Sequence, residues 1–148
     1  MQAFRQRQLP VVLVNVVAAA PGRTDAPPRM AAERPADWAD LAPALNAQPS
    51  DHRVSKRGWG AFLGTDLEKI LRAEGATQIV LAGISTSIGV ESTARDAYQL
   101  GFNVALATDA MTDMNADAHH NSISLIFPRL GECGSTADIL ALLAAFPA

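Results

Sequence analysis

The stretch from Thr77 to Asp109 constrains the fold more than any other part of the chain. It reads TQIVLAGI, STSIGVESTARDAYQLG and FNVALATD, which predicts a buried strand, a sharp turn at Gly83, a helix and a second buried strand. Two parallel strands joined by a helix form a right-handed βαβ unit. The functional crevice of such a sheet lies at the carboxyl ends of its strands. We therefore expect a site at Gly83–Gly89 and Asp109.

The remaining pattern extends this unit into one α/β domain covering residues 1–148, a doubly wound parallel sheet with helices on both faces. Thr65 followed by Glu68 is a capping-box pattern and predicts the start of a helix. Three helices are expected to bury one apolar face each. The helix after Thr65 should bury Leu63, Leu67, Ile70 and Leu71. The helix after Gly89 should bury Val90, Ala94, Ala97 and Tyr98, and the last helix should bury Ile139, Leu140, Leu142 and Leu143. Strands are predicted at roughly 10–17, 52–57, 77–83, 102–108 and 130–133.

Composition limits the partners and the compartment. With 148 residues, of which 49% are hydrophobic, the chain can bury a core of its own. A formal charge of -3 without a basic cluster argues against nucleic acid, and no apolar run is long enough to predict a membrane span. The single cysteine, Cys133, excludes an internal disulfide, fits a cytoplasmic protein, and is expected to be a small buried residue.

The segment from Ala18 to Ser50 differs from the rest because it is rich in proline and its apolar residues are mostly alanine. Such a segment cannot form a long helix or a central strand. We expect an excursion over the surface with one helical turn near Asp37–Leu41. Long loops of this kind cover a site or touch a partner subunit, or they are disordered.

Three blocks together resemble the isochorismatase-like hydrolases, the cysteine hydrolase superfamily that includes nicotinamidases. These blocks are KRGWGAFLGTDLEKILR, the Gly–x–x–Thr turn that follows IVLA, and FNVALATDAMTD. The resemblance covers the chain from about Leu9 onward. It implies a Rossmann-like three-layer fold, often dimeric or larger, and a chemistry in which an Asp, a Lys and a Cys nucleophile cleave amides or, in some members, a vinyl ether.

The resemblance assigns the family lysine to Lys56 and the nucleophile position to Gly89. A lysine there lowers the pKa of the cysteine and helps to place the substrate. Gly89 has no side chain, so the covalent mechanism is not possible at this residue. Ser85 and Ser87 carry hydroxyl groups nearby, but neither occupies the nucleophile position.

We expect the backbone of the turn to keep the family's conformation although residue 89 has no side chain. In the family, the amides matching Ser85 and Gly89 form the oxyanion hole, and the peptide bond from Ile84 to Ser85 is a cis bond. Trp59 and Phe62 are expected either to form an aromatic wall of the pocket or to pack in the core.

The family's first strand, with its catalytic Asp, has no counterpart in this sequence. Met1–Gln8 reads as the end of a helix, and FRQRQLP matches the segment before the family's second strand, which makes Asn15 a poor substitute for the Asp. We expect an N-terminally shortened domain, in which the gap belongs to a longer protein or is filled by a rearranged or partner strand.

No cofactor and no metal site are expected, because the grouping of histidines that some family members use is absent from His52, His119 and His120. Two functions remain open. One is a hydrolase homologue, catalytically impaired or divergent, with a pocket for a small amide or carboxylate. The other is a non-enzymatic assembly or partner-binding protein, in either case as a homodimer or larger homo-oligomer.

Overall fold

The computed structural model describes residues 1–25 and 35–145, and it confirms the α/β fold class and the five predicted strands. All paired strands are parallel. The strands are β1 (Val12–Val16), β2 (His52–Lys56), β3 (Gln78–Ile84), β4 (Asn103–Thr112) and β5 (Glu132–Gly134).

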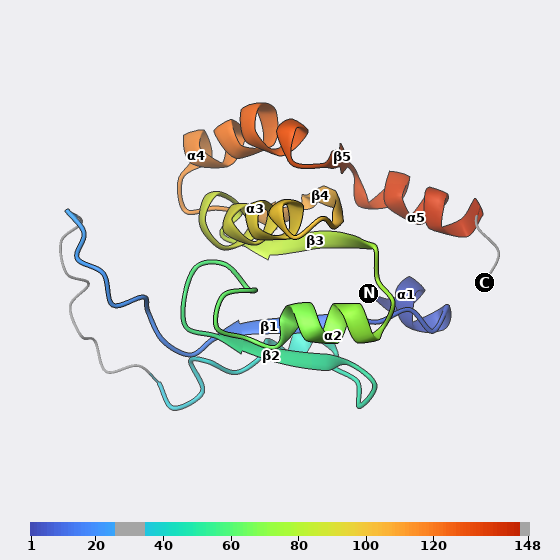
Figure 1. The fold of residues 1–148 in the computed structure, drawn as a ribbon, viewed down its shortest axis with the longest axis horizontal. Coiled ribbons are helices and arrows are strands. Elements are labelled where there is room, and N and C mark those ends of the chain that lie inside the picture. The colour runs from blue at the N-terminus through green and yellow to red at the C-terminus, as the bar shows by residue number, and fades with distance from the viewer. Residues whose placement is uncertain (26–34, 146–148) are drawn as a thin grey trace.

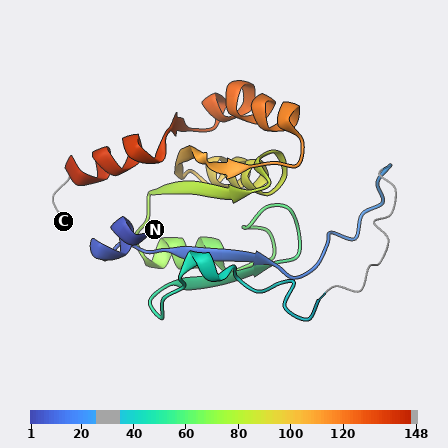
Figure 2. The ribbon, with the colours of Figure 1, turned by 180° about the vertical axis from the view of Figure 1, so that it is seen from behind.

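The strands form two separate sheets. β1 pairs with β2, and the second sheet has the order β3-β4-β5. Figures 1 and 2 show β1 and β3 running in the same direction, with β1 on the side of its sheet nearer to β3. No strand of the described residues pairs with these two neighbouring edges, which lie where the sequence predicts a missing strand.

Helices connect and cover these strands (Figure 1). No helix in the described part of the chain is long and apolar enough to cross a membrane. The helices are α1 (Gln2–Gln6), α2 (Leu67–Ala73), α3 (Glu91–Gln99), α4 (Ala116–Asn121) and α5 (Thr136–Ala145), with short turns η1 (Pro43–Leu45), η2 (Thr86–Val90), η3 (Ser122–Ile126) and η4 (Phe127–Arg129).

One hydrophobic core joins the two sheets. Val54 of β2 and Leu71 of α2 belong to the same buried cluster as Ala94 of α3, Leu106 of β4 and Phe127 of η4. Arg72 of α2 adds a cation–π contact with its guanidinium carbon 4.1 Å from the centre of the Phe102 ring. The unpaired strand edges therefore lie within a single packed unit.

The start of α2 differs from the sequence prediction. Leu67 and Leu71 are buried as expected, but Leu63 is 87% exposed because it precedes the helix. The Thr65 hydroxyl accepts a hydrogen bond from the Leu67 amide at 3.1 Å and donates to the Ala61 carbonyl at 2.5 Å. Glu68 pairs with Arg72 instead of completing a capping box.

Two other predicted apolar faces are only partly correct. Val90, Ala94 and Ala97 are buried in and before α3, but Tyr98 is exposed. In α5 no residue is buried, although every side chain from Ile139 to Ala145 is apolar. Of the four residues predicted for its buried face, Ile139 and Leu143 are half-buried, whereas Leu140 and Leu142 are exposed.

The proline-rich segment runs over the surface where the structure describes it. The Asn15 side-chain amide donates to the Ala39 carbonyl at 2.6 Å and holds part of this segment near β1. Hydrogen-bonded turns lie close to the predicted place, because the amides of Trp38 and Asp40 donate to the carbonyls of Pro35 and Asp37 at 3.1 and 2.9 Å. A further 3-10 turn lies at Pro43–Leu45, where a proline favours a helical start. The part of the prediction that concerns residues 26–34 lies outside the described residues.

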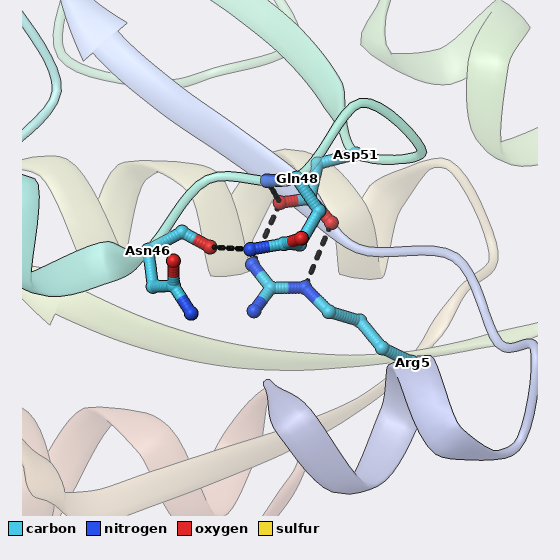
Figure 3. A network of polar contacts seen from close by, with 4 residues as sticks. All are labelled: Arg5, Asn46, Gln48 and Asp51. Carbon is cyan, nitrogen blue, oxygen red and sulfur yellow. Dashed lines mark hydrogen bonds and ion pairs between the residues drawn. The ribbon is translucent and has the colours of Figure 1, made fainter.

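An ion pair fastens α1 to the loop before β2 (Figure 3). Arg5 donates from Nε and Nη2 to the two carboxylate oxygens of Asp51 at 2.9 and 2.6 Å. The Gln48 amide also donates to Asp51, and the Gln48 side chain donates to the Asn46 carbonyl. The Arg5 hydrogen bond is the main cause that lowers the pKa of Asp51, so this carboxylate stays charged at neutral pH.

Leu67, the first residue of α2, and Leu63, which precedes the helix, provide a matched test of the packing. We expect Leu67→Ala to lower the free energy of unfolding by about 2–5 kcal/mol, because Leu67 is only 5% exposed. Leu63→Ala should change it by less than about 0.5 kcal/mol. Urea denaturation measures the free energy of unfolding of both variants. A similar decrease for the two would contradict the finding that Leu67 is buried and Leu63 is not.

Candidate functional site

Lys56 places a buried ammonium group at the carboxyl end of β2. The residue is 8% exposed, and its Nζ donates a hydrogen bond to the Trp59 carbonyl. Among the described residues, no carboxylate forms an ion pair with it. Burial lowers the pKa of Lys56, because the charged form loses hydration without gaining a negative partner.

Gly89 lies directly opposite this ammonium group, in the π-helical turn η2 that follows β3. A Cβ atom at residue 89 would lie 3.2 Å from Lys56 Nζ, 3.5 Å from the Ile84 carbonyl oxygen and 3.7 Å from the Trp59 carbonyl oxygen. Lys56 therefore points at the position where a side chain of residue 89 would begin. The space is polar and is bordered by both sheets.

The turn between β3 and η2 has an unusual backbone. Gly83 adopts a φ of +134°, which favours glycine, and the peptide bond from Ile84 to Ser85 is cis, as the family resemblance predicts. The Ser85 carbonyl accepts hydrogen bonds from the amides of Ile88 at 3.3 Å and Val90 at 3.0 Å. These bonds fix the direction in which the turn enters the helix.

Side chains from the next elements hold the same turn. Thr86 is fully buried, and its hydroxyl lies 2.8 Å from His119 Nδ1 in α4. Ser87 donates from both its amide and its hydroxyl to Asp113 Oδ2 at 2.7 Å. The amide of Ser87 is the main cause that lowers the pKa of Asp113, so this carboxylate is a weak base for activating the Ser87 hydroxyl.

The structure places Asp113, and not the expected Asp109, beside the turn that follows β3. β4 continues to Thr112, beyond the predicted end at 108, so Asp113 follows its last residue. Asp109 instead accepts hydrogen bonds from the amide and hydroxyl of Thr136 at 2.7 and 2.8 Å, next to the start of α5. The rule that parallel strands end at one edge would have found Asp113 if the length of β4 had been known.

Thr93 joins the lysine block to the helix after Gly89, and sequence reasoning missed it. Its hydroxyl donates to the Gly89 carbonyl at 2.7 Å and accepts from the Ala61 amide at 3.1 Å. The hydroxyl therefore connects the loop after β2 with the turn after β3. A threonine within a helix gives no distinct signal of this role in a single sequence.

The two aromatic candidates occupy different environments. Trp59 is 61% exposed, and its backbone carbonyl, rather than its ring, contacts Lys56. Phe62 is 8% exposed and packs against Phe102 with 5.9 Å between the ring centres. Core packing, one of the two expected roles, therefore applies to Phe62.

The remaining candidate groups lie elsewhere or lack the required geometry. Cys133 is exposed on β5, contrary to the expected burial, and pairs in register with Leu106. Within residues 1–25 and 35–145, no three His, Cys, Asp or Glu side chains are grouped as a metal site would require. An open hollow between α1 and the Ala44–Ser50 segment contains Arg5, but Asp51 already neutralises this residue.

Comparison with known proteins places these features in a family. The model of the isochorismatase domain matches residues 1–138. Isochorismatase family protein YwoC of Bacillus subtilis is 49% identical over 108 residues, which are 73% of this chain and 57% of that protein. Protein YecD of Escherichia coli O157:H7 is 47% identical over 146 residues, covering 95% of this chain and 77% of that protein.

A solved structure agrees with this assignment. The isochorismatase family protein of Burkholderia thailandensis superimposes with a TM-score of 0.91 at 44% sequence identity, covering 97% of this chain and 78% of the other. The chain thus spans little more than half of YwoC and about three quarters of YecD and the Burkholderia protein. On the family model and these similarities, the chain belongs to the isochorismatase family.

Proposed function

We propose that this member of the isochorismatase family binds a small amide or carboxylate without covalent turnover. The observation that carries the proposal is the position of Lys56 Nζ, 3.2 Å from the point where a side chain of residue 89 would begin. In family members with a cysteine at this position, the lysine would face the sulfur. In this chain the same ammonium group faces backbone, which leaves room for an atom of the ligand.

The charge of Lys56 favours an oxygen-bearing ligand. Its amine is buried and lacks a carboxylate partner among the described residues, so an anionic or strongly polar ligand would restore the interaction that burial removes. The resemblance adds the amides of Ser85 and Gly89 as donors to the same ligand. The exposed ring of Trp59 is available as one side of the pocket.

The covalent route lacks a nucleophile at this position. Gly89 offers no side chain, and the hydroxyl of Ser87 already donates to Asp113. We therefore propose binding as the function of the pocket, and an impaired or divergent hydrolase as its origin.

Nicotinate and nicotinamide serve as probes of this pocket, one with a carboxylate and the other with an amide. We expect isothermal titration calorimetry to detect binding to the unmodified chain, and Gly89→Ala to weaken it about tenfold because the added methyl group occupies the space beside Lys56. Lys56→Met should weaken nicotinate more than nicotinamide, because only nicotinate carries a full negative charge.

The pH dependence of the same titration provides a control for the role of charge. Burial lowers the pKa of Lys56, so the ammonium form is lost at a lower pH than for an ordinary lysine. Nicotinate affinity should fall as the pH rises through that lowered pKa, whereas Lys69→Met, a change at an exposed lysine, should leave the profile unchanged. Equal affinity of the unmodified chain and both pocket variants would refute the proposed site.

A second candidate function, homo-oligomeric assembly, is favoured by apolar side chains at the carboxyl edge of the strands. Leu63, Ile84 and Met114 are among the large hydrophobic residues that are exposed there. If these side chains form one contiguous apolar patch, a partner that covers it would explain their exposure.

Light scattering coupled to size exclusion tests this alternative. Assembly through the edge predicts a dimer or larger species that Met114→Lys converts to a monomer, because a charge would then be buried in the contact. Leu142→Lys on α5, at another exposed leucine, serves as the control. A monomer at all protein concentrations would count against assembly as the function.

A further inference from the structure

The amine of Lys56 can offer a ligand more than a positive charge. Lys56 and Lys69 are the two lysines of the sequence. Lys69 is an exposed residue of α2, whereas Lys56 is 8% exposed. A lysine that is removed from water can act as a nucleophile, because its neutral form carries an unshared electron pair on nitrogen.

The surroundings of Lys56 Nζ shift its protonation toward the neutral amine. Among the described residues, its hydrogen-bond partner is the Trp59 carbonyl, and no charged side chain forms an ion pair with it. Burial is the cause that lowers the pKa of Lys56. A lysine with the usual pKa of about 10.4 is neutral in only about one molecule in a thousand near pH 7.4, and each decrease of the pKa by about 1 raises this fraction about tenfold.

Glycine at residue 89 leaves one side of this amine uncovered. A Cβ atom there would lie 3.2 Å from Lys56 Nζ, so a larger side chain would begin against the nitrogen. The carbonyl oxygens of Ile84 and Trp59 border the same point at 3.5 and 3.7 Å. Both of these residues are exposed, at 75% and 61%, so the uncovered side of the amine is close to the surface. A small molecule can therefore approach it from solvent.

We propose that Lys56 is a nucleophile that binds aldehydes covalently and reversibly as an imine. The nitrogen electron pair attacks the carbonyl carbon, a C–N bond forms, and the carbonyl oxygen takes up a proton that the nitrogen gives up. The resulting hydroxyl group leaves as water with the second proton of the nitrogen, and a C=N bond forms. One aldehyde and one amine thus give one imine and one water, and hydrolysis reverses the reaction without an oxidant or a reductant.

The borders of the pocket favour an aldehyde with an aromatic or apolar body. Trp59 and Ile84 supply the two bordering carbonyls, and both also carry exposed apolar side chains. An aldehyde is neutral, so it does not need the ammonium charge that attracts a carboxylate. Imine formation therefore shares the Lys56 pocket with the proposed function but uses the other protonation state of the amine.

Reductive trapping with benzaldehyde and sodium cyanoborohydride measures this reaction. The reductant converts the imine to a stable benzylamine, and peptide mapping by mass spectrometry reports Lys56 and Lys69 separately from the amino terminus. At neutral pH we expect Lys56 to be labelled faster than Lys69 by about tenfold, because more of it is neutral. Labelling of Lys56 that is no faster than that of Lys69 would overturn the proposal.

The same labelling in urea shows whether the fold causes the difference. In the unfolded chain the two lysines should react at similar rates, because burial no longer distinguishes them. If Lys56 is labelled in urea but not in the folded protein, aldehydes do not reach the amine and the proposal is wrong.

Gly89→Val tests the side from which the aldehyde approaches. Its side chain would begin 3.2 Å from Nζ, so labelling of Lys56 should fall below the rate of Lys69. Unfolding of this variant would instead make the two rates equal, as in urea. Labelling of Lys56 at the unmodified rate in this variant would contradict the proposed approach. The comparison of the two lysines in the unmodified chain decides the proposal even if the variant does not fold.

The pH dependence distinguishes imine formation from the binding of carboxylates. As the pH rises toward the usual pKa of lysine, Lys69 also becomes neutral, so the ratio of the Lys56 rate to the Lys69 rate should fall. A ratio that rises with pH would contradict a lowered pKa at Lys56. Trapping without nicotinate binding would refute only the proposed function, and nicotinate binding without trapping would refute only imine formation.

Discussion

The site depends on a buried ammonium group that forms no ion pair within residues 1–25 and 35–145. Lys56 starts from the end of β2, in one sheet, and its Nζ reaches the turn that follows β3 in the other. Removing this charge from water costs free energy. Among the described residues, the hydrogen bond to the Trp59 carbonyl is the interaction that offsets this cost. A binding pocket is a common reason for a fold to retain such a group.

The turn after β3 is held in place from several directions, so it remains rigid even without a nucleophile. His119 contacts the Thr86 hydroxyl, Asp113 accepts from Ser87, and Thr93 bonds the Gly89 carbonyl. These contacts come from α4, from the end of β4 and from α3, which means that the fold positions the backbone amides independently of residue 89. The contacts that hold this turn therefore do not depend on a side chain at residue 89.

Much of the fold was predictable because the strands are short apolar runs separated by clear turn residues. The cis bond before Ser85 and the position of Lys56 at a strand end also followed from the sequence pattern and the family resemblance. The errors arise where the answer depends on a neighbour in space. Leu63 has an apolar side chain at helical spacing, yet it lies before the helix. The apolar surface of α5 is left partly exposed by the described residues.

The site itself was predictable only in part, for the same reason. Lys56 and Gly89 can be located because they belong to recognisable blocks, whereas Asp113 and Thr93 act through contacts that no local pattern encodes. Phe62 belongs to the same sequence block as Lys56, yet it packs in the core against Phe102. Membership of such a block therefore does not show that a residue faces the site. The sequence pattern therefore indicated Lys56 and Gly89, which the structure brings together, better than the residues that hold the turn in place.

The reactivity of a thiol introduced at residue 89 tests most directly whether Lys56 faces that position. The measurement is the rate of alkylation by iodoacetamide at pH 7 for Gly89→Cys in a Cys133→Ser background, compared with the same chain carrying Lys56→Met. An ammonium group beside the sulfur lowers the pKa of the thiol, so we predict alkylation faster by about tenfold when Lys56 is present. Equal rates for the two chains would contradict the arrangement of Lys56 and Gly89 on which the proposed function rests.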